Sequence, residues 1–203
     1  MSERAVYRMT ADAFLRWHEQ QQDRRYELVD GVPVAMAGAR RRHDQVVVNA
    51  LVALGGQLGV GPCRPFSSDT AVRVSEYQVR YPDLGVDCGR FLDEELAADA
   101  PRLVFEVLSA TTRAFDLVRK VEEYKSVPSL RHIVLVDTGE PKFIQWSRQD
   151  GGSWAYRTVE GFGATIEIAD PGISLALGVL YKGLNFVAKP RLIIGDDPPA
   201  TED

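Results

Sequence analysis

Two acidic residues near the middle of the chain have the type and the setting to do chemistry. Glu106 interrupts the apolar run "LVFEVL" at 103–108, which is typical of a buried strand. A buried carboxylate needs a compensating partner, because taking its charge out of water costs free energy. Asp83 directly follows Pro82 beside the preceding strand. Two acids on neighbouring strands predict a shared divalent cation that compensates both charges.

Mg²⁺ fits this pair of ligands, with Mn²⁺ as a possible substitute. Hard cations of this kind prefer carboxylate oxygens and keep several waters. Such an ion can activate water and stabilise the charge that develops on a phosphoryl group. Asp83 and Glu106 are therefore the metal ligands that the sequence predicts.

Lys120 is the candidate for a cation near the attacking water. On a helical wheel of about 100° per residue, Leu117, Val121 and Tyr124 form an apolar stripe and Lys120 lies on its flank. Glu106 lies roughly 10 Å back from the end of its strand, at about 3.3 Å per residue. Lys120 lies roughly 12 Å into the following helix, at about 1.5 Å per residue. The helix doubles back over the sheet, so both groups reach a similar depth.

Each of these residues also has a structural interpretation. Glu106 could form an internal ion pair, with Lys120 itself as the partner, since structural ion pairs also perturb buried acids. Asp83 could be a turn residue after proline. Lys120 could extend to solvent, as lysines on helix flanks usually do. A carboxylate pair could also belong to a glycosidase, which needs two acids flanking a scissile bond.

The remaining pattern predicts one α/β (α+β) domain with a mixed central β-sheet flanked by helices. A strand–helix–strand unit at 102–137 indicates a parallel pair of strands. Asp30-Gly31 between apolar runs predicts a hairpin. Helices are expected at 9–20, at 40–59 and at 174–184, the second ending at Gly55-Gly56 or Gly59. Residues 141–170 suggest an added antiparallel β-meander of three strands. The domain spans 1–188, and 189–203 forms an acidic flexible tail.

Composition narrows the class of protein. The apolar share is 45%, the charged share is 26%, and the net charge is −5, as in an ordinary soluble domain. No apolar stretch approaches the roughly 20 residues that span a bilayer. One disulfide between Cys63 and Cys88 is arithmetically possible. No signal peptide is evident at the N-terminus, so two reduced thiols in a cytoplasmic protein are expected instead.

An ordered set of short motifs resembles a known family. The set comprises "PD" at 82–83, "FEVLS" at 105–109, "TTRAFD" at 111–116, Lys120, Tyr124 and "VP" at 127–128, and "YELVDG" and His43 fit the same pattern. It resembles the Uma-type branch of the PD-(D/E)XK nuclease superfamily, a group of bacterial restriction-like endonucleases, over roughly residues 10 to 185.

The resemblance implies a restriction-endonuclease-like core with Mg²⁺ held by Asp83 and Glu106. Glu27 of "YELVDG" would be an additional acid of the catalytic site. The superfamily lysine two residues after the acid is replaced by Leu108 here, and the resemblance places it instead at Lys120. The catalytic set is therefore Asp83, Glu106, Lys120 and Glu27.

Two functions follow from these observations. The first is a metal-dependent endonuclease that hydrolyses DNA, working as a homodimer because cutting both strands of a duplex needs two active sites. The second is an inactive nuclease-fold module that binds nucleic acid or a protein partner, which Leu108 favours. Binding of Mg²⁺ or Mn²⁺ would separate them.

Overall fold

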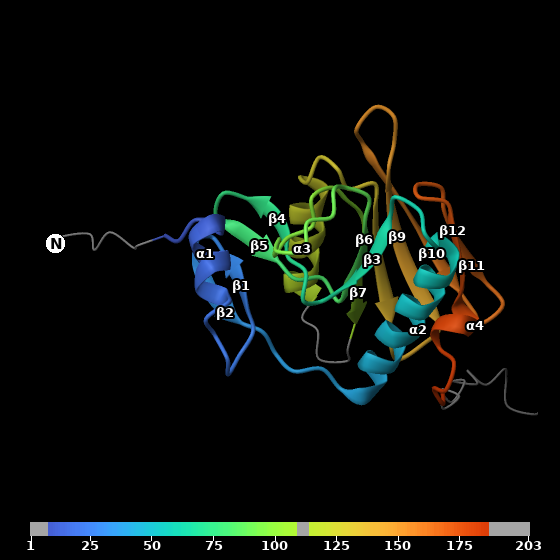
Figure 1. Cartoon of the computed structure of the whole chain (residues 1–203). Coiled ribbons are helices and arrows are strands. Elements are labelled where there is room, and N and C mark those ends of the chain that lie inside the picture. Colours follow the sequence, from blue (N-terminus) through green and yellow to red (C-terminus); the bar gives the residue numbers. More distant parts are fainter. Residues whose placement is uncertain (1–7, 109–113, 187–203) are drawn as a thin grey trace, which may run out of the picture.

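A six-stranded mixed sheet forms the centre of the protein in its computed structural model, which describes residues 8–108 and 114–186 and omits the side chains of 114–116. The strand order is β10-β9-β8-β7-β6-β3 (Figure 1). Its bounds are β3 Arg64–Ser67, β6 Leu84–Asp87, β7 Pro101–Leu108, β8 His132–Asp137, β9 Lys142–Arg148 and β10 Trp154–Glu160. The mixed sheet confirms the predicted fold class.

The predicted strand–helix–strand unit is present. β7 and β8 pair in parallel, with Glu106 opposite Leu135, and helix α3 (Ala114–Lys125) connects them. A parallel pair needs such a crossover, because the chain must return to the same end of the sheet before starting the second strand. The side chain of Glu106 thus belongs to one of the two central strands of the sheet.

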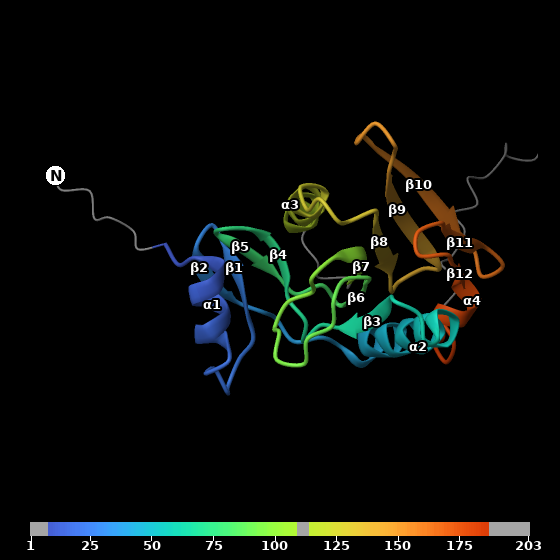
Figure 2. The same cartoon turned by 45° about the horizontal axis from the view of Figure 1, so that its top comes forward.

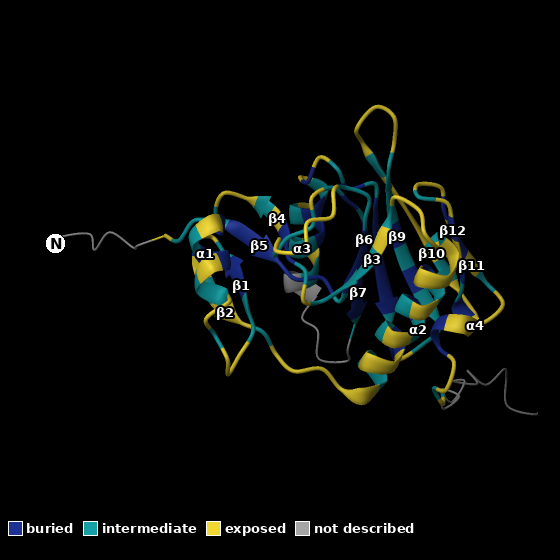
Figure 3. Ribbon diagram, in the orientation of Figure 1, coloured by how far each residue is buried: buried dark blue, intermediate teal, exposed yellow. Residues whose placement is uncertain are grey.

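Helices cover both faces of this sheet (Figure 2). On one face, helix α2 (Arg41–Leu58) packs with the short helix α4 (Leu177–Leu180) over alternate residues of β7, including Leu103 and Phe105. On the other face, α3 packs over Val104. The central strands are buried and the outer side of α2 is exposed (Figure 3). Because side chains alternate along a strand, Glu106 shares the face of Val104 and is directed toward α3.

A smaller sheet of four strands lies beside the central one. Its order is β2-β1-β5-β4, with bounds β1 Tyr26–Val29, β2 Val32–Ala35, β4 Val72–Ser75 and β5 Gln78–Arg80. Helix α1 (Ala11–His18) packs on it through Phe14 and Leu15 and is capped by Thr10. The hairpin turn at Asp30-Gly31 is confirmed, and both residues adopt positive φ angles, the conformation that asparagine-, aspartate- and glycine-rich hairpin turns favour.

Two predictions for the C-terminal part were wrong. Strand β11 (Thr165–Ile168) does not extend the β9–β10 meander but pairs with β12 (Ile173–Ala176) as a separate two-stranded sheet. The helix expected at 174–184 is limited to Leu177–Leu180. The residues before it form the strand β12, in which buried Ile173 and Leu175 alternate with exposed Ser174. This small sheet packs its apolar residues against α2 instead of adding to the central sheet.

The prediction of reduced cysteines was also wrong, because Cys63 and Cys88 form a disulfide. Arg64 of β3 lies opposite Asp87 of β6 in an antiparallel pair, so the residues just beyond them meet, with Cα atoms 4.0 Å apart. This juxtaposition is created by the strand β3, which was not predicted from the sequence, and the expected cellular compartment alone does not reveal it. Among the described residues, no helix is long and apolar enough to cross a membrane. The predicted tail, 189–203, lies outside the described residues.

Candidate active site

The buried carboxylate of Glu106 is compensated by two groups of α3. The Tyr124 hydroxyl donates a hydrogen bond of 2.7 Å to Oε1 of Glu106, and Lys120 Nζ lies 3.4 Å from the same oxygen. Glu106 is 8% exposed. The internal partner that the sequence analysis left open is therefore present, and it is Lys120. The estimate that Glu106 and Lys120 reach the same depth is confirmed.

The environment of Glu106 raises its pKa above the ordinary value for a carboxyl group. Burial raises its pKa to about 7 against the opposing charge of Lys120, and the negative charges of Asp83 and Glu27 raise it further. The Tyr124 hydrogen bond acts in the opposite direction because it stabilises the carboxylate. Burial lowers the pKa of Lys120, but the charges of Glu106 and Glu27 outweigh it and raise that pKa above its ordinary value. Lys120 is thus an ammonium held between two acids.

Asp83 lies next to Glu106 across two neighbouring strands. Leu84 pairs with Phe105 in the antiparallel β6–β7 ladder, so the next residues outward are Asp83 and Glu106. Oδ2 of Asp83 accepts a hydrogen bond of 2.7 Å from the backbone N–H of Val107. This bond fixes the carboxylate at the side of Glu106. The register of β6 and β7 thus places the two acids side by side, as the sequence predicted.

His43 is a site residue that lies outside the four catalytic residues predicted from the sequence. It comes from the first turns of α2, and its Nε2 lies 3.1 Å from Oδ2 of Asp83. Burial lowers the pKa of His43, but the hydrogen bond and charge of Asp83 outweigh burial and raise it above the ordinary value. His43 therefore holds a proton more tightly beside Asp83 than a free imidazole does. Its place in the family-like pattern was the one sequence signal that could have selected it.

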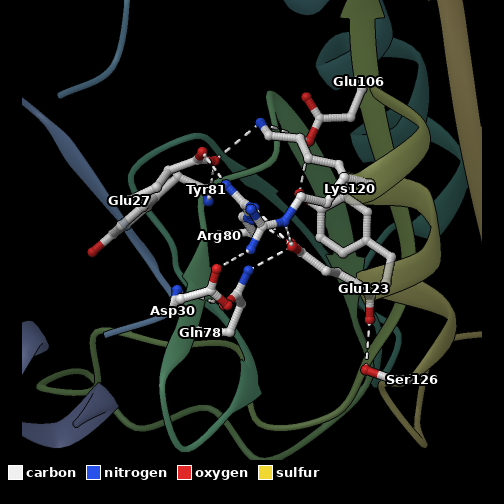
Figure 4. Close-up of polar contacts among 11 residues, drawn as sticks. Glu27, Asp30, Gln78, Arg80, Tyr81, Glu106, Lys120, Glu123 and Ser126 are labelled. Atoms are coloured by element: carbon white, nitrogen blue, oxygen red, sulfur yellow. Dashed lines mark hydrogen bonds and ion pairs between the residues drawn. The ribbon is translucent and has the colours of Figure 1, made fainter. Parts of the chain in front are cut away.

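Glu27 is connected to the site by its contact with Lys120, and not by a contact with Asp83 or Glu106. It lies on β1 of the smaller sheet, and its Oε1 is 3.0 Å from Lys120 Nζ (Figure 4). Its other oxygen, Oε2, accepts a hydrogen bond of 2.7 Å from Arg80 Nη1. The structure thus brings Glu27, Lys120 and Glu106 into one continuous chain of charges. All four predicted residues lie in this region.

Arg80, Glu123 and Tyr124 also belong to the site, although none of them was among the predicted site residues. Arg80 is 5% exposed and pairs with Glu123 of α3 as well as with Glu27. Glu123 also receives hydrogen bonds from Gln78 and Arg119. An arginine inside the short apolar-flanked strand β5 could have indicated a buried ion pair, but its partners come from distant segments and could not be inferred.

A cleft of about 540 Å³ opens over these residues. Asp83, Glu106, Lys120, Glu27 and His43 all border it. Its other walls include the end of β2, the segment 36–40 that connects β2 to α2, and Leu108 at the end of β7. Leu108 thus occupies a cleft wall at the position where the superfamily pattern has a lysine. The ammonium that reaches Glu106 comes from α3 instead.

The donor set suits a magnesium ion that takes few ligands from the protein. Two carboxylates face one cleft, and the contacts of Glu106 with Lys120 and Tyr124 use only its Oε1. In the described part of the chain, no cluster of three or more His, Cys, Asp or Glu side chains could hold a metal by itself. Mg²⁺ is usually held by one or two carboxylates together with waters and substrate phosphates, so the pair fits it.

Comparison with known proteins identifies the family. The family model described as "Uma2: Putative restriction endonuclease" matches residues 11–178. The chain belongs to the Uma2 family. The match covers every strand and helix described above that contributes to the cleft. The resemblance inferred from the motifs is therefore confirmed.

Relatives of this Uma2 chain occur in cyanobacteria. It is 28% identical over 181 residues to the uncharacterized protein slr1290 of Synechocystis sp. PCC 6803, with 88% of this chain and 94% of the relative covered. The uncharacterized protein sll1609 of the same organism is 27% identical over 165 residues, with 79% and 93% covered.

A solved structure shares the fold. The crystal structure of a putative nuclease belonging to DUF820 from Anabaena variabilis superposes with a TM-score of 0.68 at 15% identity, covering 85% of this chain and 97% of that chain. At that identity the likeness shows the fold alone. Family and fold together support a nuclease.

Proposed function

We propose that this Uma2 chain is a Mg²⁺-dependent endonuclease that hydrolyses phosphodiester bonds in DNA. The observation that carries the proposal is the position of Asp83 and Glu106. Glu106 lies on β7, Asp83 immediately precedes the neighbouring strand β6, and both border one cleft with Lys120. Carboxylates on two neighbouring strands with a lysine beside them are suited to phosphoryl transfer, in which catalysis is mostly positioning and charge stabilisation.

In this proposal Asp83 and Glu106 hold the divalent ion. The ion supplies positive charge at the phosphoryl group and lowers the pKa of water. Asp83 is preorganised for this task by the Val107 N–H and by His43, which fix its Oδ2. Glu106 is oriented by the Tyr124 hydroxyl. The protein thereby sets the directions of both carboxylates before any ligand binds.

Lys120 provides the cationic group that Leu108 cannot. Its ammonium lies between Glu106 and Glu27, on the border of the cleft. From there it can orient a water molecule and stabilise negative charge on the attacking oxygen or on the phosphate. A lysine that stays charged throughout serves this role as an electrostatic group and not as a base.

The decisive experiment is the substitution Glu106→Gln. This change removes a ligand charge with almost no change in shape, so Mg²⁺-dependent cleavage of supercoiled and linear DNA should fall below detection in a gel assay. The matched control is Glu122→Gln, an exposed acid on α3 that pairs with Lys125. Unchanged cutting by Glu106→Gln would end the proposal.

A second candidate function is a nuclease-fold module without catalysis. The observation in its favour is that Lys120 and Tyr124 already compensate Glu106, so the fold does not require a metal there. Isothermal titration calorimetry with Mg²⁺ and Mn²⁺ separates the two. Heat of binding at millimolar metal, lost in Asp83→Asn, supports the nuclease, and its absence in the parent chain supports the module.

The glycosidase alternative finds little support. The residues that border the cleft in the described part of the chain include one aromatic ring, Tyr81, which is itself buried. A sugar-binding cleft would need stacking rings around the two acids. Hydrolysis of a glycoside that continues in the presence of a chelator would revive this alternative.

The homodimer also belongs to the proposal. Each chain carries one such cleft in its described part, and cutting both strands of a duplex requires two active sites. A mass of twice 22.5 kDa by light scattering, in the absence or presence of DNA, is the expected result. A monomer that makes only single-strand nicks would contradict it.

A further inference from the structure

Arg80 is a buried guanidinium that joins two acids from different parts of the fold. It comes from β5 of the smaller sheet and bonds Glu27 of β1 and Glu123 of α3 (Figure 4). The pair with Glu123 is bidentate, with Nε–Oε2 at 2.6 Å and Nη2–Oε1 at 3.0 Å. Such fork-to-fork geometry fixes direction as well as distance.

Glu27 is held at both of its oxygens. Oε2 accepts from Arg80, while Oε1 faces Lys120 Nζ and also accepts a hydrogen bond of 3.4 Å from the Tyr81 N–H. A carboxylate held in this way cannot rotate without breaking a contact with Arg80. Its Oε1 therefore stays at the place where it meets the ammonium.

Lys120 needs a partner of this kind to remain in the site. Lysine is a point charge on a flexible stem, and on a helix flank it usually extends to water. Its distance to Glu106, 3.4 Å, is longer than its distance to Glu27, 3.0 Å. Glu27 makes the closer of the two contacts, so it is one of the two acids that fix where the ammonium lies.

We propose that Arg80 is a positioning residue for Lys120: by joining Glu27 to Glu123 it fixes the carboxylate that keeps the Lys120 ammonium beside Glu106. Glu123 serves the same purpose from α3, four residues after Arg119, with which it also pairs. The consequence for catalysis rests on the proposed function, but the effect on the position of Lys120 does not.

The first test measures Lys120 directly. In a ¹H–¹³C spectrum of the lysine side chains, the Lys120 signal is assigned by its loss in Lys120→Met. In Arg80→Gln that signal should move toward the position of a solvent-exposed lysine. The matched control is Arg73→Gln on the neighbouring strand β4, where an exposed arginine pairs with Asp12. A Lys120 signal unchanged in Arg80→Gln would overturn the inference.

The second test measures cleavage. Arg80→Gln should lower kcat by about 10- to 100-fold with little change in KM. The reason is that the Lys120 ammonium is displaced while the cleft that binds the substrate keeps its shape. Arg80→Lys keeps the positive charge but loses the bidentate guanidinium contact, so it should recover only part of the lost kcat. It also serves as a second variant in case Arg80→Gln does not fold. Equal kcat in Arg80→Gln and Arg73→Gln would contradict the inference.

The two arms separate this inference from the proposed function. If the parent chain cuts no DNA, the endonuclease proposal fails, and the Lys120 signal alone decides the role of Arg80. If the parent chain cuts and Arg80→Gln cuts equally well with an unmoved Lys120 signal, the endonuclease stands and the role of Arg80 fails.

Discussion

At the residue scale, the central feature is a carboxylate that the protein keeps in its interior with partners of its own. Glu106 contacts an ammonium and a phenol, both from α3. Two further acids lie near enough to raise its pKa. An acid so balanced between neutral and charged forms is typical of functional sites, although structural networks produce the same effect.

The Tyr124 hydroxyl should contribute measurably to stability. Tyr124→Phe removes the hydrogen bond of 2.7 Å to Glu106 and should lower the free energy of unfolding by about 1.5–3 kcal/mol, the range for bonds to charged groups. Urea denaturation measures this change. The control Tyr156→Phe, at a ring that is 72% exposed, should shift stability by less than about 0.5 kcal/mol. Equal effects in both variants would show that the buried bond contributes nothing.

His43 should titrate above its ordinary pKa. Its raised pKa means that the folded state binds the proton more tightly than the unfolded state. The stability it contributes is therefore fully present below about pH 6.5 and is lost as the pH rises through the folded pKa. Asp83→Asn removes the carboxylate that raises the pKa of His43, while burial still lowers it. The pKa of His43 should therefore fall in this variant.

Imidazole titration by NMR checks this prediction. His18 serves as an internal reference, because burial and the charge of Arg25 lower its pKa independently of Asp83. A His43 pKa that stays the same in Asp83→Asn would show that the contact between the two side chains does not determine it.

At the element scale, the register between β6 and β7 decides whether the two acids meet. Leu84 lies opposite Phe105, and a shift by one residue would turn Asp83 away from Glu106. Gly85 stands within this register. It lets β6 approach the backbone of β7 closely, because a Cβ atom there would lie 2.6 Å from the carbonyl oxygen of Leu103 and would collide with the Phe66 ring.

Gly85→Ala should therefore destabilise the protein and disturb the site. The backbone oxygen cannot give way without breaking the ladder, so a loss of about 1–3 kcal/mol is expected in thermal or urea unfolding. Gly151→Ala is the matched control, because a Cβ atom there would meet nothing within 4 Å. If Gly85→Ala unfolds at the same denaturant concentration as Gly151→Ala, the close approach is not a constraint.

At the scale of the whole molecule, the site lies where two sheets meet. Helix α3 stands between the four-stranded and the six-stranded sheet (Figures 1 and 2). Glu27 and Arg80 come from the smaller sheet, and Glu106 comes from the larger one. Polar contacts to α3 connect both sheets, so the position of the smaller sheet determines the electrostatics of the cleft.

The disulfide is a second constraint on the whole chain. It links Cys63 to Cys88, at a sequence separation of 25, at the end of the β3–β6 pair. A cross-link of this size typically contributes about 2–4 kcal/mol, mainly by restricting the unfolded chain. The double variant Cys63→Ser/Cys88→Ser should lose that amount in urea unfolding.

Reductant provides the control for the disulfide. Dithiothreitol should lower the unfolding midpoint of the parent chain and leave the double serine variant unchanged. If Ellman's reagent detects two free thiols in the denatured parent chain without reductant, the disulfide is absent and this prediction is wrong.

The sequence by itself determined the local elements and the candidate acids. The apolar run around Glu106, the turn at Asp30-Gly31 and the periodicity of 114–125 are local patterns, and each specified its element. The order of the motifs also indicated the family before any fold was known. These signals work because secondary structure and turn chemistry depend mostly on near neighbours.

Only the tertiary structure decided which charged groups touch. Arg80 meets Glu123, and His43 meets Asp83, across separations of about 40 residues that no local pattern encodes. The disulfide and the departure of β11 from the meander depend likewise on which strands pair. Ion pairs and strand partners are set by packing between distant segments, and that packing is a property of the folded chain as a whole.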